Sequence, residues 1–441
     1  MRRFQVLLFL LVPWVALRGQ GRASIAVLLR PAAARDSVAR QTLADLEQTA
    51  LDSNPGLRVA ALDVRQARAD IITAGLRPNP SAQVTGDVFP LANGALSSIQ
   101  NNTVGLSLQL PVELGGKRAR RTEAAQATAS GAGYFYVDSA RRVLLVVRNA
   151  YFDLQAADQA FVLAGRNLAV YQRLTTLSQN RFEQKQISGT EYSRALLGRA
   201  QAELAREAAL LAVRRAQDNL SLAVGRRQRV TARDTLALAA REFPSVETLE
   251  QAALRQRPDV LFARAQRTAA AANARLQDAN AQITPSVSAD YIVSQGITSY
   301  GLSGNIPLPL WSRNQGEREK SRARQEQAAR FEQAVEITAL TDVRSAWFDF
   351  DTRRAAVARF AAGGSDGILA RAQSVLDATE FAYRSGSISL LEYLDAVRTF
   401  ADITRSYVDA VTAYNKAAAA LDAASGADTP RLLERVPGGR L

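Results

Sequence analysis

The sequence VGLSLQLPVEL at residues 104–114 has a second version, YGLSGNIPLPL, at residues 300–310. In the first version Val104, Leu106 and Leu108 alternate with small or polar residues, which is the period of a β-strand with one apolar and one polar face. The second version alternates in a similar way, and both run into prolines, which end a strand. The two stretches therefore predict the same strand, written twice.

A second alternating segment precedes each of these strands, so each half of the chain is predicted to hold a pair of strands. The predicted strands cover about residues 81–89, 102–110, 286–294 and 299–307. Together they form the small β part of a chain whose remaining segments are mostly helical in pattern.

Further blocks recur in the same order along the chain. LEQTALDSNP (46–55) returns as LEQAALRQRP (249–258), and VRNAYFDL (147–154) returns as VRSAWFDF (343–350). Ordered recurrence at a nearly constant offset indicates a tandem duplication of about 200 residues.

The duplication divides the chain into a first repeat at residues 39–226, a second repeat at 245–427 and a C-terminal tail at 428–441. Each repeat opens with an Ala-rich segment, at 39–76 and 245–281, which is predicted to be helical. The predicted strands follow, and the rest of each repeat is helical in pattern.

Two very long stretches, residues 112–243 and 310–429, contain no proline. Apolar residues such as Leu144, Val147 and Tyr151 recur in them at alternating spacings of three and four, which is the pattern of a coiled-coil seam. Helices of this length build a rod or a tube rather than a compact domain.

The second repeat is longer than the first by a net five residues within its helical part, and GGSDG (363–367) is the loop-like stretch there. Glycine-rich segments interrupt helices. We therefore expect a helix break in the second repeat only. Asp158 and Arg354 interrupt the apolar seam at equivalent places in the two repeats.

The N-terminus resembles an export signal. Met1–Arg3 is positively charged and residues 4–17 are apolar, which predicts a signal peptide over residues 1–22. Residues 18–22 contain no clean small-residue cleavage site, and a buried N-terminal helix is the alternative. After residue 38 no apolar run is long enough for a membrane-spanning helix, so any spanning would be by strands.

The composition excludes most catalytic chemistry. The 441 residues include no Cys and no His, which removes thiol nucleophiles, disulfides, the usual neutral-pH base and an acylated N-terminal Cys. No phosphate-binding loop and no metal-ligand cluster is present, so we expect neither an enzyme nor a cofactor. The net charge of +13 could suit nucleic acid. The arginines, however, alternate with acidic residues and glutamines, as on solvated helix faces.

Four strands with one apolar face cannot lie alone in a bilayer, because their edge groups would lack hydrogen-bond partners. Several copies would have to close one barrel, with the polar face lining water and the apolar face meeting lipid. The alternative is a soluble coiled-coil rod that carries two ordinary hairpins.

PVELGGKR (111–118) and DGILARAQ (366–373), together with the duplication, make residues 40–430 similar to the TolC-like outer-membrane efflux proteins. The first motif especially resembles the cobalt–zinc–cadmium branch. The resemblance implies a homotrimer in the outer membrane of a Gram-negative-type bacterium, with a 12-stranded barrel and a long periplasmic helical tunnel. It also implies two protein partners, a periplasmic adaptor and an inner-membrane pump of the resistance-nodulation-division type. The missing Cys implies a protein without a lipid anchor.

The resemblance also implies functional residues at the two predicted helix–turn–helix tips, 185–192 and 385–393. The residues expected to dock the adaptor are Ile187, Ser188, Gly189, Gly386, Ser387, Ile388 and Ser389. The residues expected at the periplasmic aperture are Glu392, Asp395, Tyr383 and Glu191. Glu392 and Asp395 are three residues apart and so share one helix face.

The cargo is open at this point. The branch resemblance favours divalent heavy-metal cations, although the chain has no ligand cluster of its own to select them. The alternatives are multidrug efflux, type I protein secretion and, in a different class, a soluble basic coiled-coil scaffold that binds nucleic acid. Only the last would associate with nucleic acid in a salt-sensitive way.

Overall fold

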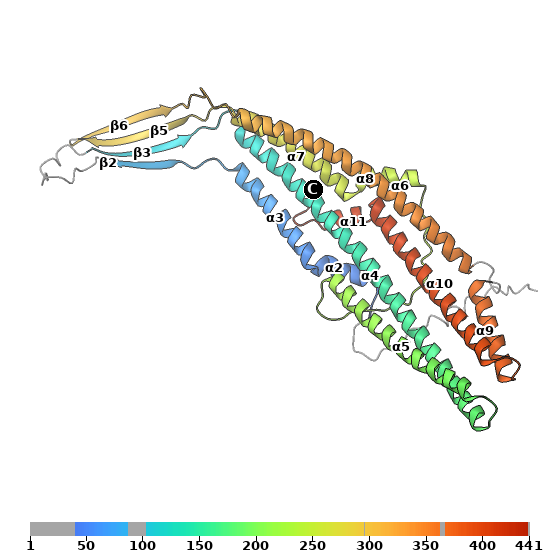
Figure 1. The fold of residues 1–441 in the computed structure, drawn as a ribbon. Helices are drawn as coiled ribbons and strands as arrows, with labels where there is room; N and C mark the ends of the chain where they lie inside the picture. The colour runs from blue at the N-terminus through green and yellow to red at the C-terminus, as the bar shows by residue number, and fades with distance from the viewer. Residues whose placement is uncertain (1–39, 87–102, 295, 362–366, 440–441) are drawn as a thin grey trace, which may run out of the picture. The chain divides into compact units, whose positions relative to one another are not determined.

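The computed structural model describes residues 40–86, 103–294, 296–361 and 367–439 (Figure 1). The described chain is mainly helical with a small sheet. The predicted signal peptide, the ends of two predicted strands (87–89 and 102) and most of the GGSDG segment lie outside the described residues.

The helices and strands follow one another along the chain as a long series. In order they are β1 (Arg40–Gln41), α2 (Leu43–Ser53), α3 (Pro55–Gly75), β2 (Ser81–Gly86), β3 (Thr103–Pro111), α4 (Lys117–Glu183), α5 (Gly189–Val224), β4 (Thr231–Ala232), α6 (Val246–Gln256), α7 (Pro258–Asn280), β5 (Ser286–Ser294), β6 (Ile297–Asn305), α8 (Gln315–Ala361), α9 (Ile368–Arg384), α10 (Leu390–Ser425) and α11 (Thr429–Leu433).

The chain forms two compact units, and each is built from separate segments. Of the described residues, the hairpin unit contains Arg40–Asp52, Val146–Glu242 and Phe348–Ala419. It includes two helical hairpins, α4–α5 and α9–α10, and the short parallel pair β1–β4. The sheet unit contains Ser53–Leu145, Phe243–Trp347 and the chain from Ala420 onward, including the four longer strands.

The long helices agree with the proline-free stretches of the sequence. Helix α4 is one uninterrupted helix of 67 residues. Its counterpart in the second repeat is broken, because α8 ends at Ala361 and α9 begins at Ile368. The predicted break in the second repeat alone is therefore confirmed. None of the helices in the described ranges is long and apolar enough to cross a membrane.

The two Ala-rich segments are helical as predicted, and each consists of two helices. The first breaks at Asn54–Pro55 and the second at Arg257–Pro258. Proline is well accommodated in the first turn of a helix but disfavours the helical conformation of the residue before it, so each Pro begins a new helix. The Asn54 side chain caps α3 by accepting the backbone N–H of Gly56 and of Leu57.

The coiled-coil seam is buried as its spacing predicts. Leu144, Val147 and Leu154 on α4 have no exposed surface, and Val343 and Phe350 on α8 are also buried. The alternation of three and four residues therefore identified the packed face of both long helices.

The four longer strands form one antiparallel sheet with the order β2-β3-β5-β6 (Figure 1). Strands from the two repeats meet at its centre, where β3 pairs with β5 over their full length. The register places Leu106 opposite Tyr291 and Leu108 opposite Ala289, so the apolar residues of neighbouring strands share one face. β2 and β6 each have one edge that no strand of the described residues pairs with.

Candidate functional site

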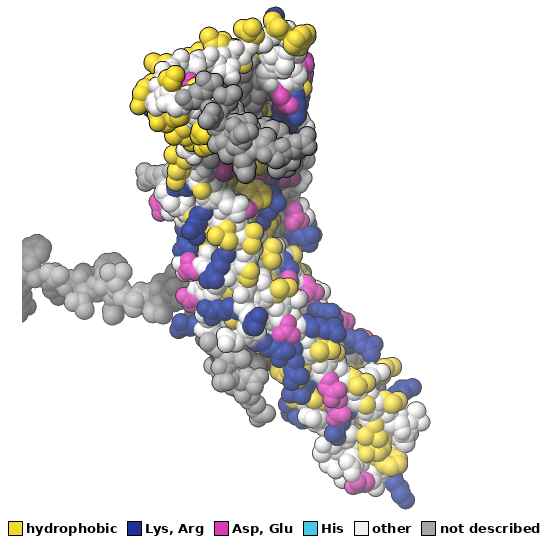
Figure 2. All heavy atoms as spheres, turned by 90° about the vertical axis from the view of Figure 1, so that its left-hand side faces the viewer, with side chains coloured by type: hydrophobic (Ala, Val, Ile, Leu, Met, Phe, Trp, Pro, Cys, Tyr) yellow, Lys and Arg dark blue, Asp and Glu magenta, His cyan; other side chains and the backbone are white. Residues whose placement is uncertain are grey.

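The apolar face of the sheet is its exposed face. Leu108 in the middle of β3 is 54% exposed, and Leu302 on β6 is 84% exposed. Val84, Val104 and Tyr300 are exposed on the same face. In Figure 2 hydrophobic side chains gather over the strands at the top of the view.

The polar face of the sheet is the more enclosed one, although its side chains are hydrophilic. Ser286 and Ser288 on β5 are buried, and Ser107 on β3 is half-buried. Gln109 donates a hydrogen bond to Ser286 across the β3–β5 pair. These side chains satisfy one another over the sheet surface.

A sheet in a water-soluble protein buries its apolar face and exposes its polar face. Along β3 and β5 the reverse holds, because the apolar side chains are mostly more exposed than the polar ones. Each of β3, β5 and β6 has nine residues, the length that a tilted strand needs to cross the hydrocarbon core. The arrangement can present hydrocarbon-compatible side chains to lipid and hydroxyl groups to water.

Exposed apolar residues continue beyond the end of β6. Leu308 and Leu310 are exposed, and Trp311 is 86% exposed. Trp311 lies six residues beyond the end of β6 at Asn305, and tryptophan near the end of a lipid-facing strand is typical of the interfacial aromatic girdle of outer-membrane proteins. Trp311 was not among the predicted site residues, although an isolated Trp shortly after a predicted strand was a signal that could have identified it.

The PVELGGKR motif forms the junction between β3 and α4. Gly115 and Gly116 both have a positive φ, at 71° and 68°, and a side chain at Gly115 would collide with Gln282. Lys117 is buried, and its ammonium group donates to the carbonyl of Gln282 at 2.7 Å and to the hydroxyl of Thr284 at 2.6 Å. Burial lowers the pKa of Lys117. The fold explains these residues without reference to a cargo.

Both helical tips turn through the same backbone arrangement. Lys185 after α4 has φ 58° and Gly386 after α9 has φ 78°, so each turn places one residue in the left-handed conformation. The N–H of Gln186 donates to the carbonyl of Arg181 at 2.8 Å, and the N–H of Ser387 donates to the carbonyl of Ala382 at 2.9 Å. Each is the hydrogen bond across five residues that defines a Schellman motif. All the predicted docking residues lie within or next to these turns: Ile187, Ser188, Gly189, Gly386, Ser387, Ile388 and Ser389.

Serine caps the helix that follows each turn. Ser188 and Glu191 form a reciprocal capping box at the start of α5. Ser389 accepts the backbone N–H of Glu392 at 3.3 Å at the start of α10. Part of what made these residues conspicuous in the sequence is therefore the ordinary requirement of a helix start.

The predicted aperture residues fall into two different environments. Tyr383 is buried and stacks on Tyr393, with ring centroids 5.3 Å apart, while the Arg181 guanidinium lies 5.1 Å from its ring. Glu191, in contrast, belongs to the capping box at the start of α5. Tyr383 and Glu191 therefore have different neighbours in this chain. Ile388 packs against the same apolar cluster as Tyr383 and is only half-exposed.

Glu392 and Asp395 lie on the first turns of α10, and both side chains are exposed. Their spacing of three residues leaves both carboxylates free to face the same side of the helix. No group of three or more His, Cys, Asp or Glu side chains that could hold a metal ion occurs in the part of the chain that the structure describes.

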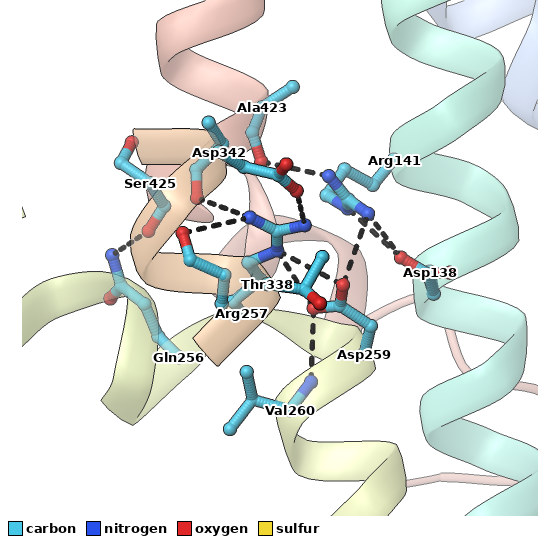
Figure 3. Close-up of polar contacts among 12 residues, drawn as sticks. Asp138, Arg141, Gln256, Arg257, Asp259, Val260, Thr338, Asp342, Ala423 and Ser425 are labelled. Carbon is cyan, nitrogen blue, oxygen red and sulfur yellow. Dashed lines mark hydrogen bonds and ion pairs between the residues drawn. The ribbon is translucent and has the colours of Figure 1, made fainter. Parts of the chain in front are cut away.

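A cluster of charged side chains lies inside the sheet unit (Figure 3). Arg257 binds Asp259 at 2.9 Å and Asp342 at 2.5 Å, and its side chain is only 5% exposed. Arg141 binds Asp138 at 2.6 Å and approaches Asp259 at 3.9 Å. Arg142 also binds Asp138, at 2.5 Å, so three arginines face three aspartates. The cluster therefore joins α4, α7 and α8 within this unit.

The structure also reveals a titratable side chain on the seam of the hairpin unit. Burial raises the pKa of Asp158 to about 6, against a smaller opposing effect of the positive charge of Arg40. The folded chain therefore favours the protonated form of this carboxyl group. This position is the interruption of the apolar seam noted in the sequence.

Replacing Asp158 by Asn is expected to stabilise the protein by about 2 kcal/mol at pH 7, and by much less near pH 4. The raised pKa means that the wild-type protein is most stable while Asp158 is protonated, and it loses this stability as the pH rises from about 4 through about 6. Urea unfolding between pH 4 and pH 8 measures the difference. Asp349→Asn, on an exposed ion pair with Arg353, is the control. Equal pH profiles for Asp158→Asn and wild type would contradict this account.

Comparison of the sequence with known protein families identifies the family of this chain. The family described as "Outer membrane efflux protein" matches residues 46–226 and again residues 249–427. The chain belongs to the outer membrane efflux protein family. The resemblance to TolC-like proteins is thereby confirmed, and the chain is an outer-membrane efflux channel rather than an enzyme.

Proteins similar to this chain are named for cation efflux, for cobalt-zinc-cadmium resistance and for pyoverdine export. The chain is 26% identical over 385 residues to the cation efflux system protein CusC of Escherichia coli O157:H7, covering 79% of this chain and 78% of the relative. It is 26% identical over 377 residues to the cobalt-zinc-cadmium resistance protein CzcC of Cupriavidus metallidurans, covering 84% and 86%. It is also 26% identical over 394 residues to the pyoverdine export outer membrane protein OpmQ of Pseudomonas aeruginosa, covering 81% and 79%.

The fold is that of solved outer-membrane channels. The CmeC outer membrane channel of Campylobacter jejuni superposes with a TM-score of 0.75 at 17% identity, and the match covers 90% of both chains. A mainly helical chain with a small sheet, as predicted, is therefore the fold of this family.

Proposed function

We propose that the chain is the outer-membrane exit duct of a tripartite pump that exports divalent heavy-metal cations. The observation that carries the duct is the reversed sheet, in which apolar side chains are exposed and hydroxyl side chains are enclosed. A soluble coiled-coil scaffold would have no reason to expose the apolar face of a four-stranded sheet.

The duct is a homotrimer with a 12-stranded barrel. The larger sheet of one chain has four strands in the described residues, and β2 and β6 leave unpaired edges at its two sides. Unpaired backbone groups are not tolerated in hydrocarbon, so β6 of one copy pairs with β2 of the next. Three copies close the ring, and their long helices continue it as a periplasmic tunnel.

The two halves of the chain are tandem copies, and a repeated ion pair supports this. Glu47 binds Arg148 in the hairpin unit, and Glu250 binds Arg344 in the sheet unit. These four residues occupy equivalent places in the sequence blocks that recur. The repeats extend over residues 39–226 and 245–427, followed by the tail at 428–441.

The helical tips form the docking end for a periplasmic adaptor. Their support is the shared turn geometry and the exposure of Ser188, Gly189 and Gly386. Glu392 and Asp395 line the aperture, where three copies bring six carboxylates toward one axis. Tyr383 and Glu191 hold the two hairpins of the closed aperture in place from their separate positions.

The energy for export comes from an inner-membrane pump of the resistance-nodulation-division type. Lipid of the outer membrane surrounds the barrel, and no nucleic acid takes part. Residues 1–22 are removed as a signal peptide on the way to the outer membrane.

The alternative cargo is organic. The name of OpmQ refers to pyoverdine export, and OpmQ is as similar to this chain as CusC and CzcC are. The fold of the PVELGGKR junction also accounts for that motif without a metal. Multidrug efflux and type I protein secretion are therefore the competing functions for the same duct.

The test compares cells with and without the chain for accumulated zinc, cobalt and cadmium and for a lipophilic dye. Metal retention with normal dye efflux is the expected result. Retained dye with normal metal content would identify a multidrug duct, and normal values for both would favour protein secretion. Leu108→Arg, expected not to assemble in the outer membrane, serves as a loss-of-duct control beside the deletion.

A further inference from the structure

One charged residue lies on the strands of the sheet. Among the described strand residues 81–86, 103–111, 286–294 and 297–305, Asp290 is the only Asp, Glu, Lys or Arg. The other described residues of its face are Ser, Thr, Gln, Asn and Gly, apart from Pro111, Ile292 and Ile297. As the only charge among these described strand residues, the Asp290 carboxylate contributes strongly to the electrostatic potential near this part of the sheet.

Asp290 is held on the polar face of the sheet. It is the central residue of β5, opposite Ser107 on β3 and Gly301 on β6. Its carboxylate accepts a hydrogen bond from the hydroxyl of Ser107 and another, at 2.8 Å, from the hydroxyl of Ser303. Because Gly301 has no side chain, nothing on β6 directly opposite covers the carboxylate.

Both hydrogen-bond donors are neutral, so they orient the charge without cancelling it. None of the Arg and Lys side chains that the structure describes forms an ion pair with Asp290. A carboxylate fixed by two hydroxyls and open to water on one side can attract a passing cation.

We infer that Asp290 forms a ring of three carboxylates within the barrel and that this ring makes the barrel favour cations over anions. The inference rests on the proposed trimeric barrel, in which three-fold symmetry places the three side chains at one level. It assigns charge selection to the strands, in addition to the carboxylates proposed at the helical tips. The cargo class it favours is a hydrated cation.

The test uses the absence of Cys from the chain, which makes every introduced Cys unique. Ser299→Cys places a thiol on the Asp290 face of β6, and Leu302→Cys places one on the apolar face. Trimers in outer membranes are treated with a cationic or an anionic methanethiosulfonate of similar size. The ratio of the two labelling rates reports the local potential and does not require the periplasmic end to open.

We expect the Ser299→Cys thiol to react and the Leu302→Cys thiol to be protected by lipid. Adding Asp290→Asn should lower the cationic-to-anionic rate ratio at Ser299→Cys about sevenfold for a change of about one kT in potential, because the reagents differ by two charges. Asp290→Glu should keep the ratio, and Asp377→Asn on helix α9 should leave it unchanged.

Two different results would contradict the carboxylate ring and the proposed duct, respectively. An unchanged ratio in Asp290→Asn, with the Ser299→Cys thiol still reactive, would refute the carboxylate ring and leave the proposed duct intact. Reaction of the Leu302→Cys thiol instead of the Ser299→Cys thiol would reverse the faces of the sheet and so refute the duct itself. Heat-sensitive trimers on gels confirm that each variant has assembled.

Discussion

Replacing Leu108 by Arg is expected to prevent the chain from accumulating in the outer membrane as the proposed trimer. Leu108 lies near the middle of β3 on the apolar face, and 54% of it is exposed. An Arg that faces lipid near the bilayer midplane costs about 2–4 kcal/mol, and a trimer contains three copies. The measurement is the fraction of heat-sensitive trimer in isolated outer membranes.

Gln109→Arg is the matched control, because Gln109 is the next residue of β3 and belongs to the polar face. This variant loses the hydrogen bond to Ser286 but keeps its charge in water, so assembly should fall only slightly. If both variants assembled equally well, the apolar face of the sheet would not be the lipid-facing one.

Replacing Arg257 by Met is expected to destabilise the folded chain by about 3 kcal/mol. The Arg257 side chain is buried and binds Asp259, Asp342 and the carbonyl groups of Ala339 and Ala424. Removing one partner of a buried ion pair leaves the remaining charge without compensation, which costs about 3–5 kcal/mol. Because Asp342 is partly exposed to water, the expected loss of stability lies at the lower end of this range. Urea unfolding of detergent-solubilised protein measures it.

Arg353→Met is the control for this loss, because Arg353 pairs with Asp349 at an exposed site. That pair should contribute less than about 1 kcal/mol. Adding Asp259→Asn to Arg257→Met should recover part of the lost stability, since it removes one of the charges left unpaired. A loss no larger for Arg257→Met than for Arg353→Met would show that the cluster contributes little.

The sequence was sufficient for features that depend on a local period. The alternation around Leu106 predicted both the strand and the face that would be exposed, because successive side chains of a strand point to opposite sides. The spacing around Val147 likewise predicted the packed face of α4. GGSDG predicted a break because glycine weakens a helix wherever the helix lies.

Other features depend on contacts that no local pattern contains. Lys185 gave no sign in the sequence of its left-handed backbone conformation, which only its alignment with Gly386 makes recognisable. The half-buried position of Ile388 arises from packing between the two hairpins. The breaks at Pro55 and Pro258 could have been predicted, but the Ala-rich composition around them obscured the proline signal.

The two unpaired edges of the sheet have a consequence for heredity. If every barrel needs three chains to close, the sheet can fold completely only when the trimer assembles. A chain with a defective β2 or β6 edge would then prevent closure of any barrel that contains it. In a cell that makes equal amounts of sound and defective chains, only about one-eighth of randomly assembled trimers contain three sound copies. Edge mutations should therefore be dominant over the wild-type gene, whereas a simple deletion should be recessive.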